Sequence, residues 1–197
     1  MIRLVKRCAW AGNDPKMREY HDKEWGTPIH DERLLFEFLV LEGAQAGLSW
    51  NTILQKRENF RVAFDNFNYN KIAKYNEQKI QQLMNNEGII RNRRKIEATI
   101  TNANALLKVQ KEFGSFDKYI WKFVNYKTLV NRFKELSELP SKTEQSEKMS
   151  KELKKRGFKF VGPTICYAFM QAVGMVNDHT IDCFRYKEIN QFISSKK

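Results

Sequence analysis

The sequence has no long apolar run. Its start, MIRLVKRCAWAGND, holds no hydrophobic stretch long enough for a signal peptide. The longest apolar stretch, residues 34–41, is interrupted by Glu37 and followed by Glu42, so it is far too short to cross a bilayer. These absences predict a cytoplasmic protein that has no membrane partner.

Cysteines and acidic residues are both scarce. The three cysteines, Cys8, Cys166 and Cys183, are too few and too scattered for a disulfide framework, which leaves metal binding or packing as their use. The 23 Asp and Glu residues are outnumbered by 35 Lys and Arg residues, which gives a formal net charge of +12. Such an excess is typical of a protein that binds a polyanion, either nucleic acid or an anionic membrane surface, although charge also serves solubility alone.

Alternating strand patterns are missing too, and the hydrophobic periodicity is helical nearly throughout. Residues 32–42 are apolar on most faces and follow Asp31, which predicts a buried helix with Asp31 as its N-cap. Ser49 is expected to cap a second helix over residues 50–64. A long third helix is predicted after Gly88, where apolar residues recur at helical spacing: Ile96, Ile100, Ala103 and Leu107.

The C-terminal half predicts shorter helices joined by polar segments. Four of them fit the pattern, over residues 116–124, 126–136, 146–156 and 163–173. Residues 137–148 are polar and predict a loop, and residues 187–197, which end in SSKK, predict a frayed tail. The predicted fold class is therefore all-α, with residues 1–186 as a single helical domain.

The stretch LKKRGFKFVGPTICYAFMQAVG, residues 153–174, has the plan of a helix–hairpin–helix. Two helical patterns flank a turn that contains Gly157 and Gly162, and Pro163 suits the first position of the second helix. The start of that helix offers free N–H groups to a phosphate, and basic side chains surround the turn: Lys154, Lys155, Arg156 and Lys159. The segment is therefore either a clamp on the DNA backbone or an ordinary αα-hairpin with a solvated basic face.

Potential metal ligands lie at the two ends of the chain. Cys8 and His21 lie near the N-terminus, while His179 and Cys183 are four residues apart and share one face if that stretch is helical. Two thiolates and two imidazoles suit a tetrahedral zinc ion with no open position, hence a structural site. The spacing is not that of a zinc finger, and single Cys and His residues are often simply packed in cores, so both interpretations stand at this point.

Aromatic and acidic residues cluster in YHDKEWG, residues 20–26, and in LEGAQAGLSW, residues 41–50. Their aromatic side chains could line a pocket for a flat heterocycle. Glu42 closes an apolar helix, where a carboxylate needs a hydrogen-bond donor, and the exocyclic amino group of adenine is such a donor. The competing interpretation makes Trp25 and Trp50 core filler and Glu42 a capping or surface group.

Six segments in fixed order carry a resemblance: CAWAGND, YHDKEWG, LEGAQAGLSW, GIIRNRRKI, KKRGFKFVGPTICYAFMQAVG and VNDHTIDC. From Arg7 to Cys183 the chain resembles the bacterial DNA-3-methyladenine glycosylase I family. The resemblance implies a divergent helix–hairpin–helix glycosylase fold, with two lobes around an active-site cleft and a structural zinc that joins the N- and C-terminal segments. Met17 departs from the pattern, because relatives can have a tyrosine there.

The resemblance also implies roles for individual residues. One zinc ion per chain would be held by four ligands, Cys8, His21, His179 and Cys183. The base pocket would contain Glu42 as the catalytic residue and four aromatic walls, Tyr20, Trp50, Trp25 and Trp10. Gly47 and Leu48 resemble the turn that fills the gap left by an extruded nucleotide. In the hairpin, we expect DNA contacts from Gly157, Lys159, Gly162 and Thr164.

The implied activity is base-excision repair. The enzyme would flip the damaged nucleotide out of double-stranded DNA and hydrolyse its N-glycosidic bond, which leaves an abasic site and free 3-methyladenine. The methylated base is cationic and already a good leaving group, so Glu42 needs only to pair with it while Tyr20 and Trp50 stack on the ring. No lysine Schiff base is implied, so we expect no lyase activity, and we expect a monomer.

Two other function classes share parts of this pattern. A non-catalytic zinc-containing DNA-binding protein needs the hairpin and the metal ligands but no recessed pocket around Glu42. A zinc nucleobase deaminase needs H-x-E followed by P-C-x-x-C; neither motif occurs, so this class is excluded. Asp178 precedes a predicted ligand, and our hypothesis is that it orients His179 rather than acting as a catalytic aspartate.

Overall fold

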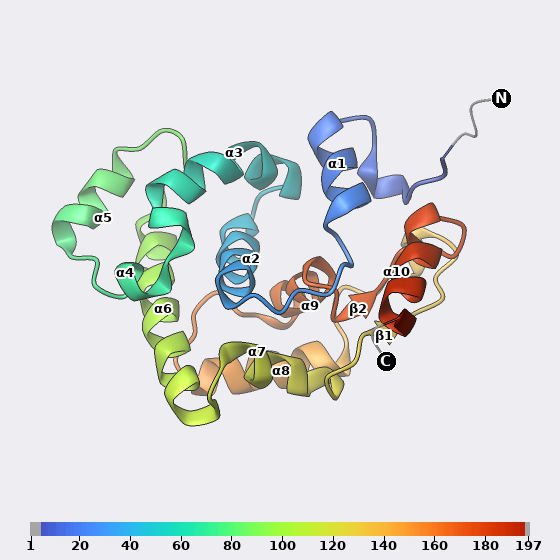
Figure 1. The fold of residues 1–197 in the computed structure, drawn as a ribbon. Coiled ribbons are helices and arrows are strands. Elements are labelled where there is room, and N and C mark those ends of the chain that lie inside the picture. The colour runs from blue at the N-terminus through green and yellow to red at the C-terminus, as the bar shows by residue number, and fades with distance from the viewer. Residues whose placement is uncertain (1–4, 196–197) are drawn as a thin grey trace.

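The protein is described by a computed structural model that covers residues 5–195 and is mostly helical (Figure 1). Its α-helices are α1 (Pro15–Lys23), α2 (Glu32–Gln45), α3 (Trp50–Ala63), α4 (Tyr69–Ile72), α5 (Glu77–Met84), α6 (Arg93–Phe113), α7 (Phe116–Trp121), α8 (Glu144–Lys155), α9 (Pro163–Ala172) and α10 (Phe184–Ser195). Four short 3-10 helices accompany them: η1 (Ala9–Ala11), η2 (Asp65–Phe67), η3 (Lys122–Val124) and η4 (Leu136–Glu138). In the part of the chain described, no helix has the length and apolarity that a bilayer crossing requires.

Helix α2 lies at the centre of the fold because it is apolar on almost every side. Residues 35–44 are all buried, and α2 packs against α3, α6, α7 and α9. The predicted cap is confirmed, since Asp31 accepts a hydrogen bond from Leu34 N at 2.8 Å. Glu37 is fully buried within α2, and two arginines of α3 compensate its charge: Arg57 Nε and Arg61 Nη2 each lie 2.7 Å from Glu37 Oε1. This pairing fixes how α2 is rotated, and with it the direction in which its C-terminal end faces.

Residues 126–136 were predicted to be helical, and this prediction is wrong. Asn125 and Tyr126 have φ angles of +52° and +59°, a left-handed backbone that ends the preceding helix. The chain then enters β1 (Leu129–Val130), which pairs in parallel with β2 (Val176–Asn177). Strands of two residues are too short to show alternation in a sequence, which is why none was predicted.

The prediction of a frayed tail over residues 187–197 is also wrong as far as Ser195, whereas residues 196–197 lie outside the described residues. This stretch continues α10, and Ile189 is only 1% exposed. Asn177 Nδ2 donates to Tyr186 O at 3.3 Å and to Asn190 Oδ1 at 2.9 Å, which ties α10 to β2. The sequence did contain a short helical signal, because Phe192 and Ile193 follow Ile189 at spacings of three and four residues, but the prediction followed the polar end SSKK.

Ile189 tests whether α10 is part of the folded core. We expect Ile189→Ala to lower the free energy of unfolding by about 2–4 kcal/mol, because it leaves a cavity beneath the helix. Ile193→Ala, at a half-buried position of the same helix, is the matched control and should cost less than half as much. Urea denaturation measures both, and equal stability of Ile189→Ala and the unchanged protein would contradict the packing.

Candidate active site and metal centre

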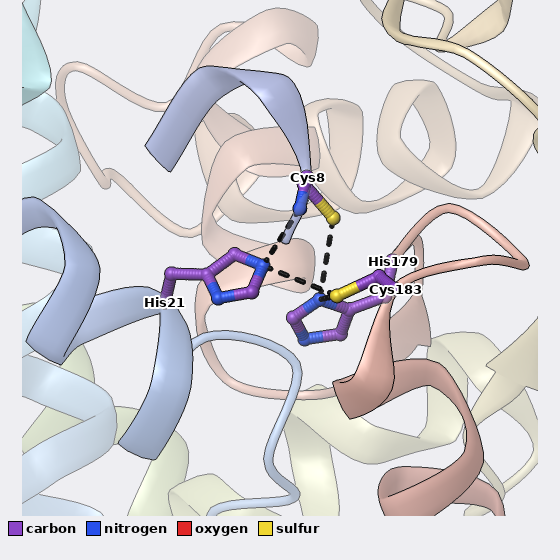
Figure 2. A group of neighbouring side chains, drawn as sticks. All are labelled: Cys8, His21, His179 and Cys183. Carbon is purple, nitrogen blue, oxygen red and sulfur yellow. Dashed lines mark hydrogen bonds between the residues drawn. The ribbon is translucent and has the colours of Figure 1, made fainter. Parts of the chain in front are cut away.

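Four potential metal ligands from opposite ends of the chain meet in one buried group, which contains Cys8, His21, His179 and Cys183 (Figure 2). Their ligand atoms all lie within 4.8 Å of one another. His21 is carried by α1, whereas His179 and Cys183 lie in turns between β2 and α10 and not on a helix. His179 and Cys183 therefore do not share the face of a helix. A turn brings them together, in which Cys183 N donates to Thr180 O at 2.8 Å.

The distances within this group suit a tetrahedral ion. Cys8 Sγ lies 3.5 Å from His179 Nδ1, and Cys183 Sγ lies 3.6 Å from the same nitrogen and 3.4 Å from His21 Nε2. Zinc–ligand bonds of about 2.0 Å to nitrogen and about 2.3 Å to sulfur place tetrahedral ligand atoms roughly 3.3–3.8 Å apart. The residues present therefore fit a metal ion held by two sulfurs and two nitrogens.

The second nitrogen of each imidazole is also occupied, which fixes the ring. His21 Nδ1 lies 2.8 Å from Asp22 Oδ1, and His179 Nε2 lies 3.0 Å from Trp25 O. Such outer contacts orient ligating histidines and set their tautomers. The pKa of the Cys183 thiol is lowered, because Cys8 hydrogen bonds to its sulfur and the rings of His179 and His21 add to the effect. The group is thus arranged to present thiolate and imidazole lone pairs inward.

Asp178 does not orient His179, so that hypothesis was wrong. Its carboxylate is buried and accepts hydrogen bonds from Tyr167 OH at 2.5 Å, Asn131 Nδ2 at 2.6 Å and Gln171 Nε2 at 2.8 Å. His179 Nε2 instead has Trp25 O as its partner, at 3.0 Å. Asp178 instead links α9 to the segment that follows β1.

A pocket of about 270 Å³ lies beside the metal-ligand group. Helices α1, α2, α3 and α9 each contribute to its walls, as do the segments around η1 and η4. The lining residues are Trp10, Met17, Tyr20, Trp25, Glu42, Gln45, Trp50, Leu136, Leu139, Ala168 and Gln171. The four aromatic residues predicted to form a base pocket, the predicted Glu42 and the divergent Met17 are therefore brought together.

The aromatic walls connect the pocket to the metal-ligand group. The ring centroids of Tyr20 and Trp50 are 5.2 Å apart, and those of Trp10 and Trp25 are 4.8 Å apart in an edge contact. The edge of the Trp25 ring also contacts His179, with centroids 4.7 Å apart. Tyr20 and His21 are consecutive on α1, so one short helix supplies a pocket wall and a potential metal ligand.

Glu42 is the one acidic residue in the lining of this pocket. Its side chain is only 4% exposed, and within residues 5–195 it has no hydrogen-bond partner. Burial raises the pKa of Glu42 to about 8. The indole N–H groups of Trp10 and Trp50 are likewise buried without a partner in the described structure. Buried polar groups normally have partners, so a pocket with one free carboxyl and two free donors is suited to a polar, flat ligand.

The predicted nucleotide-replacing turn borders the same pocket. A second hollow of about 200 Å³ shares Glu42, Gln45 and Ala168 with the first and continues to Gly47, Leu48 and Thr164. Gly47 has a φ of +78°, which glycine adopts readily, and Leu48 is 42% exposed. A large apolar side chain thus protrudes next to the opening of the pocket.

Helices α8 and α9 form the predicted helical hairpin, joined by residues 156–162. Gly157 has a φ of +88°, and Pro163 occupies the first turn of α9. Gly162 caps α9 without a side chain, so the first backbone N–H groups of this helix have no side-chain cap. Lys159 is exposed at the turn and makes no ion pair with any described residue. These are the features that a phosphate-binding hairpin needs.

Five lining residues were not predicted from the sequence: Gln45, Leu136, Leu139, Ala168 and Gln171. Leu136 and Leu139 come from the segment around η4, which was assigned to a helix end and a loop. Ala168 and Gln171 lie on α9, and the side chain of Gln171 donates to Asp178. Gln45 had a signal, because it lies within the segment LEGAQAGLSW that also contains Glu42.

Comparison with known proteins agrees with this arrangement. The family model described as methyladenine glycosylase matches residues 10–186. The chain belongs to the methyladenine glycosylase family. DNA-3-methyladenine glycosylase 1 of Escherichia coli (strain K12) is 50% identical over 182 residues, which cover 92% of this chain and 97% of that protein. DNA-3-methyladenine glycosylase of Haemophilus influenzae is 51% identical over 180 residues, covering 91% and 97%.

A solved structure of the same family has a closely similar fold. It is the crystal structure of a tyrosine-to-phenylalanine variant of 3-methyladenine DNA glycosylase I in complex with 3-methyladenine. The two structures align with a TM-score of 0.88 and 38% sequence identity, covering 90% of this chain and 96% of that one. The methyladenine glycosylase family model ends at residue 186, so most of α10 lies beyond the part of the chain that it describes.

The raised pKa of Glu42 predicts a pH-dependent stability. A carboxyl whose pKa is about 8 when folded and near 4.5 when unfolded holds its proton more tightly in the folded protein. Its burial therefore destabilises the fold progressively as pH rises from about 4.5 to about 8. We expect Glu42→Gln to exceed the unchanged protein in free energy of unfolding by on the order of 2–4 kcal/mol at pH 8, with a much smaller gap at pH 5.

Urea denaturation at the two pH values measures this gap. Glu19→Gln, the same chemical change at an exposed position of α1, is the control and should show no growing gap. A gap for Glu42→Gln that does not change between pH 5 and pH 8 would contradict a raised pKa.

Proposed function

We propose that this protein is a monofunctional DNA glycosylase that removes 3-methyladenine from double-stranded DNA by hydrolysis. The observation that carries the proposal is the buried carboxyl of Glu42, which lies without a partner in a pocket walled by Tyr20, Trp50, Trp25 and Trp10. The relatives are named for this activity, and one related structure is a complex with 3-methyladenine.

Charge accounts for the choice of base. 3-Methyladenine in DNA carries a positive charge on its ring, and a cation beside a carboxyl lowers the pKa of that carboxyl. Glu42 is mostly protonated at neutral pH in the empty pocket, so we expect it to release its proton to solvent as the cationic base enters. An undamaged neutral adenine does not supply this compensation, so a charged Glu42 would remain costly beside it.

The aromatic walls account for the shape of the ligand. Tyr20 and Trp50 are adjacent aromatic walls of the pocket, with ring centroids 5.2 Å apart. Their π faces favour a cationic ring over a neutral one. The indole N–H groups of Trp10 and Trp50 are free donors, and the unmethylated ring nitrogens of a purine are acceptors. The pocket thus offers a stacking surface, donors and one negative charge to the same bicyclic ligand.

The chemistry needs little more from the protein. Because the methylated base leaves as a neutral molecule, no strong general acid is required at its ring. The glycosidic bond breaks with the bonding electrons moving to the base, which becomes neutral. Water then adds to the sugar carbon and loses a proton to solvent. Glu42 stabilises the positive charge held in the base and the neighbouring sugar, in a site from which most water is excluded. The pocket lining contains no lysine, in keeping with hydrolysis without a lyase step.

DNA is held by the backbone and opened locally. The charge of +12 favours a polyanion, and the α8–α9 hairpin presents Lys159 and the start of α9 to a phosphate. Leu48 protrudes beside the pocket, where it can occupy the gap in the base stack once a nucleotide has been extruded. Gly47 gives the turn its left-handed bend, and Thr164 lines the second hollow from the first turn of α9. Gly157 and Gly162 lie in the hairpin turn that precedes Thr164, where we expect them to let the backbone approach the phosphates.

A structural zinc ion completes the proposal. Cys8, His21, His179 and Cys183 would hold it, and with four protein ligands it would supply a cross-link rather than an activated water. The cross-link would join the segment before η1 to the segment before α10. It would thereby fix α1, on which the pocket residue Tyr20 directly precedes the potential ligand His21.

Glu42→Gln is the direct test of the mechanism. The amide keeps an acceptor but cannot become negative, so we expect single-turnover release of 3-methyladenine from methylated duplex DNA to fall on the order of 10²-fold. Glu19→Gln should release the base at the unchanged rate. Circular dichroism checks the fold, and binding to undamaged duplex should be the same in all three proteins. Full activity in folded Glu42→Gln would show that the charge is not needed, and duplex binding without any base release by the unchanged protein would favour a non-catalytic DNA-binding role.

The metal centre makes a separate prediction. Elemental analysis of the purified protein should give one zinc per chain, and Cys183→Ser should lose it and melt roughly 10 °C or more lower. Cys166→Ala is the matched control, because Cys166 is a buried cysteine of α9 outside the ligand group, and it should retain the zinc. A cooperatively folded, unchanged protein without zinc would contradict the proposal.

A further inference from the structure

Helix α6 contacts both of the turns that, on the proposed function, touch DNA. We call residues 44–48, which are the last two residues of α2 and the first three of the segment before α3, the insertion turn. Residues 156–162, between α8 and α9, are the hairpin turn. Helix α6 lies beside α2 and carries Lys95 and Asn102 seven residues apart (Figure 1). Seven residues are close to two helical turns, so both side chains lie on the same face of α6.

Lys95 ties down the insertion turn. Its Nζ donates to Ala44 O and to Ala46 O, each at 2.7 Å. These carbonyls lie at the C-terminal end of α2, where helical carbonyls lack partners and the helix dipole favours a positive charge. The rest of the turn has little packing: a Cβ built on Gly47 would meet nothing within 4 Å, and Leu48 is 42% exposed. The ammonium group therefore holds the end of α2 and the start of this turn to α6.

Asn102 ties down the hairpin turn in a matching way. Its Oδ1 accepts from Lys159 N at 2.7 Å, and its Nδ2 donates to Lys159 O at 3.0 Å. The next residue, Phe160, has a φ of +53°, a left-handed conformation that is costly for a side chain of this kind. Asn102 is 3% exposed, so its amide is committed to this pair of bonds. The amide thus holds the turn in a conformation that the chain would otherwise leave.

The hairpin turn also lies against α2, directly before the insertion turn. A Cβ added to Gly43 would lie 3.2 Å from the Cβ of Phe160, so α2 and the hairpin turn are in close contact there. Gly43 and Phe160 share a cavity of only about 20 Å³ with Lys95 and Asn102. Lys95 and Asn102 therefore act on neighbouring segments, the end of α2 that leads into the insertion turn and the hairpin turn packed against it.

We propose that Lys95 and Asn102 are positioning residues that hold the insertion turn and the hairpin turn at a fixed separation. Leu48 can enter a gap in the base stack only if its position relative to the gripped phosphates is correct, and small misplacements cost large factors in rate. Lys95 controls the placement of Leu48, whereas Asn102 controls the grip on the backbone. Neither residue touches the base. The inference rests on the proposed function for its meaning but makes predictions about DNA binding that do not require catalysis.

The test compares two duplexes of the same sequence, one intact and one with a tetrahydrofuran abasic-site analogue, by fluorescence anisotropy. Lys95→Met removes the donors but keeps the length of the side chain. We expect its preference for the duplex with the abasic-site analogue to fall about tenfold, the effect of losing charged hydrogen bonds. Asn102→Leu should weaken binding to both duplexes by about the same factor, roughly tenfold, because it loosens the backbone grip. Lys95→Arg, which can still donate to both carbonyls, should restore most of the preference.

Lys108→Met is the matched control, because it removes the same charge from an exposed position of the same helix. Affinity for free 3-methyladenine, followed by tryptophan fluorescence, should stay within about twofold in every variant, because the pocket is intact. Two results would overturn the inference: Lys95→Met behaving like Lys108→Met, or a loss of free-base affinity as large as the loss of duplex preference. If the unchanged protein released no base, the proposed function would fail, while the two duplex affinities would still decide the roles of Lys95 and Asn102.

Discussion

The contact between the two ends of the chain at Cys8, His21, His179 and Cys183 is the constraint on which the rest of the site depends. The fold brings Cys8 and Cys183 together from distant parts of the chain, and the group contacts the pocket wall where the Trp25 and His179 rings meet. His179 holds the carbonyl of Trp25, and His21 is adjacent to Tyr20. A metal ion there would set the positions of two pocket walls without touching the ligand. The metal-ligand group and the pocket are thus coupled through the peptide bond between Tyr20 and His21 and through the hydrogen bond between His179 and Trp25.

Glu42 shows the opposite relation, because its burial costs stability, and on the proposed function that cost serves the recognition of a charged base. A buried carboxyl without a partner raises the free energy of the folded state, and the raised pKa is the measure of that cost. Five residues earlier on the same helix, Glu37 is also buried, but its charge is compensated by hydrogen bonds from Arg57 and Arg61. Two buried glutamates on one helix therefore have different tasks. The paired one holds α2 against α3, and on the proposed function the unpaired one binds the cationic base.

Much of the site could be predicted from the sequence, because its main residues lie in short segments with unusual composition. Tyr20, Glu42 and Trp50 lie in two such segments, and the structure places them around one pocket. Leu136, Leu139 and Gln171 could not be predicted, since they enter the pocket through tertiary packing that leaves no periodic pattern. The hairpin helices were predicted from apolar spacing and glycine placement. Helix α10 was not predicted, because its helical pattern is limited to Ile189, Phe192 and Ile193, only the first of which is fully buried, and it is followed at once by the polar residues SSKK.

Two glycines explain why the metal group and the pocket can lie so close together. Gly174 has a φ of +71°, and a Cβ there would lie 2.3 Å from the carbonyl carbon of Thr27, a distance that no side chain tolerates. Gly26 has a φ of +78°, and a Cβ there would press on the His179 ring at 3.1 Å. Between them the backbones join, with Gly26 N donating to Gln171 O at 3.0 Å. The segment that follows Trp25 can therefore lie directly against the end of α9. Any side chain at either glycine would force apart the two segments that carry Trp25 and His179, and the metal ligands and the pocket walls would separate together.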